Sequence, residues 1–169
     1  MRNLTQGNTV KKIVIERPGG YGRLQIKEFP TPTPQNQEVL IEVSAAGVNF
    51  ADVFVRLGLY KSGKEFVGWP ITPGFEFSGK VIKCGRDVSG LAEGTPVFGI
   101  TRFGAYASHL CVPGSQVFAL PDGSKFSSDD WAAFPAVFLT AYHGLFQNIV
   151  VRPEMKILVH SAAGGVGGA

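Results

Sequence analysis

Cysteine is scarce in this sequence, and its scarcity limits both metal and disulfide chemistry. The chain has 169 residues and two cysteines, Cys84 and Cys111, which are too far apart to form a C-x-x-C pair. A zinc knuckle is therefore excluded, and a disulfide framework is not supported. A single bridge between the two cysteines is open as an alternative, but two free thiols in a reducing compartment is the simpler interpretation.

Long apolar runs and clusters of one charge are also missing. No run approaches the length of a transmembrane helix and residues 1–9 are polar, so neither a membrane span nor a signal peptide is predicted. Lysine and arginine are scattered along the chain and the formal net charge is only +3. The sequence therefore lacks the clustered basic residues of a nucleic-acid-binding protein. With 44% hydrophobic and 17% charged residues, we expect a folded, cytoplasmic protein.

Glycine and proline, by contrast, are abundant, with 22 and 11 residues. This composition favours many short strands separated by turns over long helices. Strands are expected at residues 12–15, 24–29, 38–46, 75–83, 95–100, 105–112 and 116–120. Their spacing of roughly 8–12 residues is typical of a barrel-like β domain.

The strand pattern is interrupted once, near residue 50. Phe50, Val53, Phe54 and Leu57 follow the i, i+3, i+4, i+7 spacing of a helix, and Asn49 is suited to be its N-cap. The following residues, 59–73, are rich in glycine and proline and predict a long loop, which in compact domains is often a binding loop.

A second helical region is predicted after the strands. Residues 127–130, Ser-Ser-Asp-Asp, combine hydroxyl caps with acidic residues that favour a helix N-terminus. Pro135 should break this helix, so a second helix is expected at about residues 137–147.

The C-terminal stretch has the pattern of a nucleotide-binding turn. Residues 157–159 are continuously apolar and predict a buried parallel strand, and Ala162, Gly164 and Gly167 then fit A-x-G-x-x-G. Such small residues let the chain turn tightly against a pyrophosphate. A flexible glycine-rich end is the alternative. Because the helix that should follow is missing from the sequence, we expect this chain to be the front half of a larger protein.

Four motifs occur in an order that resembles one known family. They are A-G-V-N-F-A-D with R-L-G-L-Y at residues 46–60, P-G-F-E-F-S-G at 73–79, T-A-Y at 140–142 and A-A-G-G-V-G at 162–167. This order is similar to the zinc-independent quinone oxidoreductase branch of the medium-chain dehydrogenase/reductase superfamily, most of all to its vesicle amine transport protein homologues. The resemblance covers about residues 10–169.

The resemblance implies a mainly β fold with helices (α+β). A GroES-like β-barrel domain would be followed by bridging helices and by the first strand and glycine turn of a Rossmann domain. The implied divisions are a flexible N-terminus at 1–10, the GroES-like catalytic domain at 11–126, bridging helices at 127–153 and the truncated Rossmann domain at 154–169. NADPH would bind in the cleft between the domains, and the parent protein would be a homodimer.

The resemblance also implies roles for individual residues. Asn49 would lie beside the nicotinamide or the substrate oxygen, Tyr60 would line the substrate pocket and donate a hydrogen bond or a proton, and Thr140 would contact the nicotinamide. The residues along the pyrophosphate and ribose would be Ala163, Gly164, Gly165 and Val166.

No metal is expected. Zinc-dependent relatives have a cysteine ligand at the position of Asn49 and a histidine at that of Phe75, and neither residue here is a usual zinc ligand. Without zinc, oxidation of a simple alcohol becomes hard, whereas a quinone or an α,β-unsaturated carbonyl still accepts a hydride. The implied parent activity is NADPH-dependent reduction of a quinone or enone, for which this chain alone is expected to be incompetent.

Each of these residues also has a structural interpretation. Asn49 could serve only as a helix cap, Tyr60 could pack a loop over the barrel, and the Thr140 hydroxyl could bond back to a helix carbonyl. Glu76 could be catalytic, but the preferred interpretation is a carboxylate that orders its loop by accepting backbone amides.

Other polar residues are given structural roles. Asp52 and Arg56 are spaced i, i+4, as in a helix ion pair. His109, His143 and His160 share no ligand spacing.

One departure from the family supports an alternative function. Several relatives have a tyrosine where this chain has Phe54, so one candidate donor is absent. The alternative is a non-catalytic GroES-like module that binds a protein or membrane partner.

Overall fold

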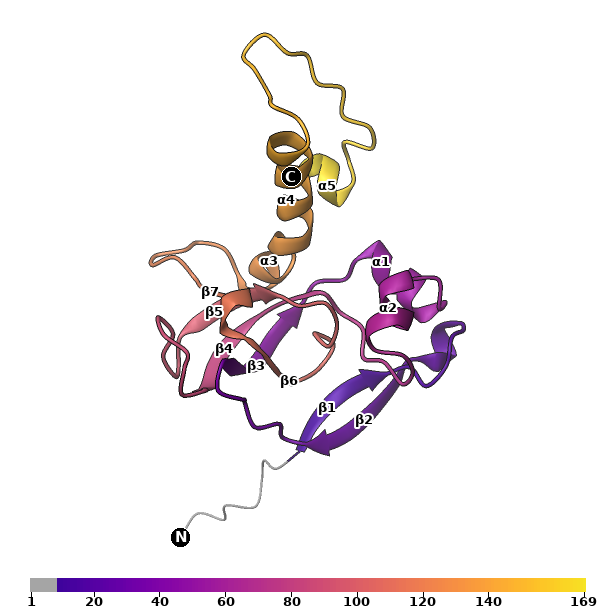
Figure 1. Cartoon of the computed structure of the whole chain (residues 1–169), viewed down its shortest axis with the longest axis vertical. Coiled ribbons are helices and arrows are strands. Elements are labelled where there is room, and N and C mark those ends of the chain that lie inside the picture. The colour runs from indigo at the N-terminus through magenta and orange to yellow at the C-terminus, as the bar shows by residue number, and fades with distance from the viewer. Residues whose placement is uncertain (1–8) are drawn as a thin grey trace.

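The computed structural model describes residues 9–169 and shows a barrel-like β unit from which a helix projects (Figure 1). Of the flexible N-terminus predicted at 1–10, residues 1–8 lie outside the described residues. The prediction is wrong for Thr9 and Val10, which begin strand β1 (Thr9–Val14). Val10 is 1% exposed and pairs with Phe29, so burial of its side chain fixes this part of the chain.

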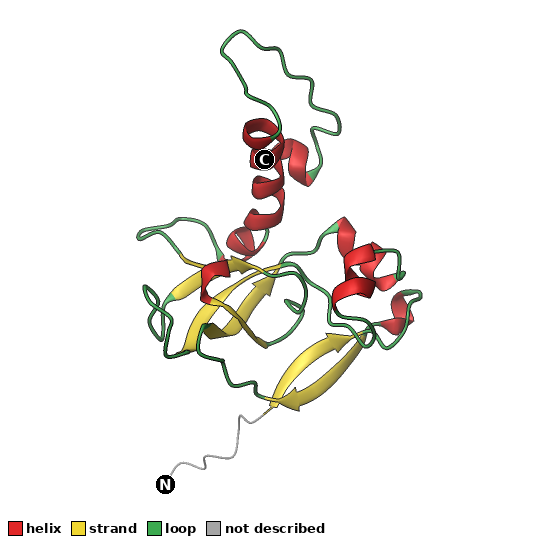
Figure 2. Ribbon diagram, viewed as in Figure 1, coloured by secondary structure: helices red, strands yellow, loops and turns green. Residues whose placement is uncertain are grey.

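The strands form two antiparallel sheets, drawn as yellow arrows in Figure 2. β1 pairs with β2 (Gln25–Pro30) in a two-stranded sheet. The other sheet has the order β6-β3-β4-β5-β7, with β3 Glu38–Ala46, β4 Glu76–Cys84, β5 Pro96–Ile100, β6 His109–Pro113 and β7 Val117–Ala119. The predicted mainly β fold is therefore confirmed, and each predicted strand before residue 121 has a counterpart.

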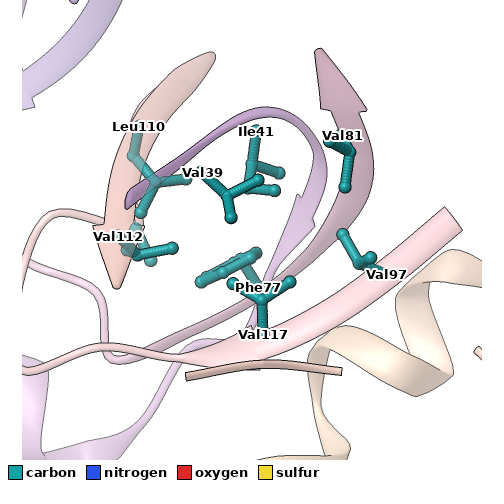
Figure 3. Packing of buried hydrophobic residues seen from close by; sticks show 9 residues of the cluster. Val39, Ile41, Phe77, Val81, Val97, Leu110, Val112 and Val117 are labelled. Carbon is teal, nitrogen blue, oxygen red and sulfur yellow. The ribbon is translucent and has the colours of Figure 1, made fainter. Parts of the chain in front are cut away.

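The core is the inner face of the five-stranded sheet (Figure 3). Phe77, 0% exposed, lies among the side chains of the neighbouring strands. Ile41 on β3 is paired with Val81 on β4 and with Leu110 on β6, and all three side chains are buried. This follows from the period of two along each strand, which turns alternate apolar residues to the same face.

The helices lie at the edges of the β unit. They are α1 Phe50–Arg56, α2 Lys61–Phe66, α3 Ser128–Ala132, α4 Phe134–Tyr142 and α5 Gly165–Gly168, with short 3-10 turns η1 Tyr21–Arg23 and η2 Gly114–Gln116 and the π-helical turn η3 His143–Gln147. A second apolar cluster of Ile15, Val55 and Ile71 fixes α1 to the β1 side of the molecule. No helix within residues 9–169 combines the length and apolar character needed to cross a membrane.

The predicted break at Pro135 is confirmed. α3 begins after Ser127, whose Oγ accepts a hydrogen bond from Asp130 N, and α4 begins at Phe134 with Pro135 in its first turn. Proline fits there because its missing N–H falls among the amides that have no partner within the helix.

Three other local predictions are wrong. Residues 61–66 of the predicted loop form α2, which carries a Lys61–Glu65 ion pair at i, i+4 (3.4 Å). Residues 157–159 form no strand, because no described strand lies alongside to accept their backbone hydrogen bonds. The helix expected to be missing beyond the glycine motif begins within it, as the single turn α5.

Candidate active site

A cleft of about 450 Å³ lies where the β unit, helix α4 and the glycine turn meet. Figure 1 shows α4 rising from the β unit with α5 packed beside it. The cleft is lined by Asn49, Ala51, Tyr60, Phe75, Ile100, Ala136, Val137, Leu139, Thr140, His143 and Val166. Its wall is mostly apolar with a few polar groups, as in pockets that bind small molecules.

Four of the seven site residues predicted from the sequence line this one cleft. Asn49 comes from the start of α1, Tyr60 from the start of α2, Thr140 from α4 and Val166 from α5. The other three do not line the cleft: Ala163 and Gly164 lie in the adjoining turn, and Gly165 is the first residue of α5.

Asn49 is held at the cleft by hydrogen bonds at both its backbone and its side chain. It is the N-cap of α1, and its N–H donates to Asp52 Oδ2 (2.9 Å). Its side-chain Nδ2 donates to Glu76 Oε1 (2.7 Å). The cap predicted from the sequence is confirmed, and the bond to Glu76 fixes the plane of the amide that borders the cleft.

Glu76 connects Asn49 to the opposite wall. Its second oxygen, Oε2, accepts from the backbone N–H of Ala136 in α4 (2.7 Å), and the residue is 2% exposed. Gly47 leaves room for this carboxylate, because a Cβ there would lie 2.3 Å from Glu76 Oε1. Glu76 accepts a backbone amide as predicted, but that amide belongs to α4 and not to the loop beside Glu76.

A second buried carboxylate, Asp52, orders the segments beneath the cleft. Besides the Asn49 amide it accepts hydrogen bonds from Gly74 N (3.0 Å) and from the Tyr106 hydroxyl (2.9 Å). Burial, the negative charge of Asp52 and its hydrogen bond raise the pKa of Tyr106 well above its ordinary value, with a smaller contribution from Glu76. Tyr106 gave no signal in the sequence, since its partner is 54 residues away.

The suggested ion pair between Asp52 and Arg56 is wrong. Arg56 instead donates from Nη1 to the Gly19 carbonyl and lies over the ring of Tyr21, 4.4 Å from its centroid. The acid turns inward to the buried amides while the guanidinium turns to the η1 side.

Tyr60 belongs to an aromatic cluster. Its ring lies 5.5 Å from Phe75 and 6.1 Å from Phe103, which fits the predicted packing of the loop on the β unit. Among residues 9–169 its hydroxyl has no recorded hydrogen-bond partner, and the residue lines the cleft. The structure is therefore compatible with both interpretations of Tyr60. Its ring packs the loop on the β unit, and its hydroxyl is available to hydrogen-bond a ligand in the cleft.

The Thr140 hydroxyl donates to the Ala136 carbonyl within α4 (2.6 Å), as the structural interpretation predicted. Its proton is thus committed, but the oxygen still has acceptor capacity toward the cleft.

The glycine turn is tight and packs closely on α4. A Cβ at Gly167 would lie 2.4 Å from the Ser161 carbonyl oxygen, and one at Gly165 would lie 2.8 Å from Val137 Cγ1. These close approaches explain the small residues of the motif and bring Val166 to the cleft.

The histidines and Phe75 bear on the question of a metal. Within residues 9–169 no three His, Cys, Asp or Glu side chains are grouped as ligands. Phe75 packs against Phe103 (5.5 Å).

His143, taken as purely structural from the sequence, lines the cleft and bonds through Nδ1 to Gln147 Oε1 (2.6 Å). Its spacing of about one helical turn after Thr140 is the signal that could have found it.

Comparison with known proteins gives consistent results. The family model for the alcohol dehydrogenase GroES-like domain matches residues 35–161. The mouse protein named synaptic vesicle membrane protein VAT-1 homolog-like is 38% identical over 166 residues, which cover 98% of this chain and 39% of that protein.

Solved structures agree. The human VAT-1 homolog-like protein superposes with a TM-score of 0.88 at 38% identity, covering 94% of this chain and 50% of that one. The Escherichia coli quinone oxidoreductase, solved in complex with NADPH, gives 0.83 at 32% identity, covering 93% and 47%. The chain thus spans about half of each solved relative and less of the mouse protein.

Proposed function

This chain belongs to the alcohol dehydrogenase GroES-like domain family, in the quinone oxidoreductase-like group of the medium-chain dehydrogenases/reductases, and we propose that it supplies the substrate-binding half of an NADPH-dependent reductase. The proposed substrates are quinones or α,β-unsaturated carbonyls, reduced without zinc. In this proposal residues 11–126 form the catalytic domain, 127–153 the bridging helices and 154–169 the start of the nucleotide-binding domain.

The observation that carries the proposal is the convergence of Asn49, Tyr60, Thr140 and Val166 on one cleft. These residues come from four separate elements spread over more than a hundred positions, yet the family motifs assign all of them to the same site. The predominantly apolar wall suits a flat nicotinamide or quinone ring, and its few polar groups suit orientation of that ring.

The donor set also fits reduction without a metal. Bound NADPH would supply the hydride. The Asn49 amide, fixed by Glu76, has a remaining N–H that can donate to the substrate oxygen, and the uncommitted Tyr60 hydroxyl can donate a hydrogen bond or a proton to it. The Thr140 oxygen can accept from the nicotinamide carboxamide.

Residues 163–166 would lie along the pyrophosphate and ribose in this proposal. The close approach of Gly167 to Ser161 leaves room only for glycine there, so no side chain at 167 stands in the way of a phosphate. Because the remainder of the nucleotide site would come from segments outside this sequence, the chain alone should not turn over.

The test is a chimera in which residues 1–169 replace the matching half of the E. coli quinone oxidoreductase. Oxidation of NADPH at 340 nm is followed with an ortho-quinone and with an enone. We expect turnover by the chimera, none by the isolated chain, and a fall in kcat for Asn49→Ala and Tyr60→Phe. A folded chimera that binds NADPH but reduces neither substrate would refute the proposal.

One observation favours the second candidate, a non-catalytic binding module. Val48, just before α1, and Phe50 in α1 are 83% and 76% exposed, and Phe54 packs edge-to-face on Phe50, so this region presents apolar side chains to the outside. Sedimentation of the chimera with anionic lipid vesicles, lost in Phe50→Ser, together with absence of turnover would establish this candidate instead.

A further inference from the structure

The buried carboxylate of Glu76 is not part of the cleft lining, yet it bonds to both of its walls. One oxygen accepts from the Asn49 side chain on the β-unit side and the other from Ala136 N on the α4 side, each at 2.7 Å. Asn49 and Ala136 both line the cleft, whereas Glu76 lies behind them. No other described side chain bridges the two walls in this way.

The local chemistry explains why a carboxylate is needed there. The first amides of a helix lack partners within the helix, and although Pro135 removes one of them, Ala136 N remains one that needs an acceptor. An anion at this end of α4 is favoured by the helix dipole. The Asn49 amide supplies the second donor, and neither oxygen of the buried group is left unpaired.

We propose that Glu76 is a positioning residue that sets the separation of the two cleft walls by binding Asn49 and α4 at once. It acts on the chemistry through Asn49 and does not touch the substrate. The relevance to catalysis rests on the proposed function, but the coupling of the walls does not.

Glu76→Gln tests this role because glutamine keeps the size and shape of the glutamate side chain and changes only its hydrogen bonding. A carboxylate accepts two hydrogen bonds from two donors, whereas an amide can accept at its oxygen alone and turns an NH2 toward the other donor. Whichever way the new amide faces, one wall loses its bond. The double variant Glu76→Gln/Asn49→Asp restores both, because the amide then donates to the new carboxylate and accepts from Ala136 N. Aspartate is also a good N-cap for α1.

The experiment is amide NMR of the 169-residue chain, read at the Ala136 backbone and the neighbouring cleft residue Thr140. We expect Glu76→Gln to shift both signals and the double variant to return them toward their original positions. Asn49→Asp alone opposes two carboxylates and should be less stable at neutral pH than at pH 4, since one carboxyl is then protonated. Glu42→Gln, an exposed change on β3, is the matched control and should move neither signal.

The outcomes are separable. The inference would be overturned if the Ala136 and Thr140 signals do not move in Glu76→Gln. It would also be overturned if these signals are shifted as far in the double variant as in the single one. Should Glu76→Gln fail to fold, recovery of the fold in the double variant supports the inference and continued unfolding refutes it. The NMR shifts can follow this pattern while the wild-type chimera neither binds NADPH nor reduces a substrate. In that case the proposed function fails and the positioning role of Glu76 stands.

Discussion

Removing the hydroxyl of Tyr106 should reveal how strongly the buried Asp52 carboxylate depends on its three donors. In Tyr106→Phe, Asp52 keeps the amides of Asn49 and Gly74 and loses the bond of 2.9 Å from the phenol. A hydrogen bond to a charged group contributes about 1.5–3 kcal/mol net, so we expect a loss of that size in the free energy of unfolding. For a chain of this length the melting temperature should fall by roughly 3–12 °C.

The pH dependence gives a second, independent readout. The folded state holds the Tyr106 proton more tightly than the unfolded state, because the pKa of the folded tyrosine is raised by burial and by Asp52. The stability contributed by Tyr106 is therefore complete below the unfolded pKa of about 10 and is lost as the pH rises above it. The wild type should lose up to about 1.4 kcal/mol per pH unit more than Tyr106→Phe in this range.

The assay is urea unfolding followed by circular dichroism at pH 7 and between pH 9.5 and 11. The control is Tyr142→Phe, since that tyrosine is 56% exposed and contacts only Phe146 among the rings of the described chain. Wild type and Tyr106→Phe with equal stability at pH 7, or with parallel losses above pH 10, would contradict the reasoning.

Three further outcomes follow from the same contacts. Phe77→Ala empties the centre of the core and should cost about 3–5 kcal/mol in urea unfolding, against much less for the half-exposed Phe118→Ala; equal costs would refute the assigned core. Burial and Glu38 raise the pKa of Cys111 to about 11, so iodoacetamide labelling should be slow at pH 8 and accelerate toward pH 11; a fast reaction at pH 8 would be inconsistent with this. Thr140→Val should leave stability nearly unchanged but weaken NADPH binding by the chimera, measured by fluorescence titration, whereas unchanged affinity would remove Thr140 from the site.

The elements that were predictable from the sequence are those determined by neighbours along the chain. The alternation at residues 38–46 predicted β3 with its observed bounds, and Pro135 marked the break between α3 and α4. Period, caps and proline act locally, so one sequence suffices to find them. α2 was missed because Gly63 and the flanking prolines outweighed the i, i+4 pair of Lys61 and Glu65.

The remaining features depend on distant partners. A parallel strand at 157–159 needs neighbouring strands that no described segment provides. The apolar run alone was therefore not enough to predict the conformation of these residues. The site residues Asn49 and Thr140 were identified through motifs, while the bonds from Glu76 to Ala136 and from Tyr106 to Asp52 join positions 60 and 54 residues apart. No local pattern encodes such pairs.

The two buried carboxylates also constrain how the proposed reduction can proceed. Glu76 and Asp52 are 2% and 7% exposed beneath the cleft, and no lysine or arginine of the described chain is among the residues that line it. A negative charge developing on a substrate oxygen would therefore meet two anions in a medium of low dielectric, and neutral donors such as Asn49 offset this only in part. Proton donation to that oxygen as the charge forms avoids the repulsion, and the Tyr60 hydroxyl lines the cleft without a hydrogen-bond partner among residues 9–169. We expect quinone reduction by the chimera to be slower in D2O than in H2O, and this difference to shrink in Tyr60→Phe; equal rates in the two solvents at saturating NADPH would show that the oxyanion forms without the proton.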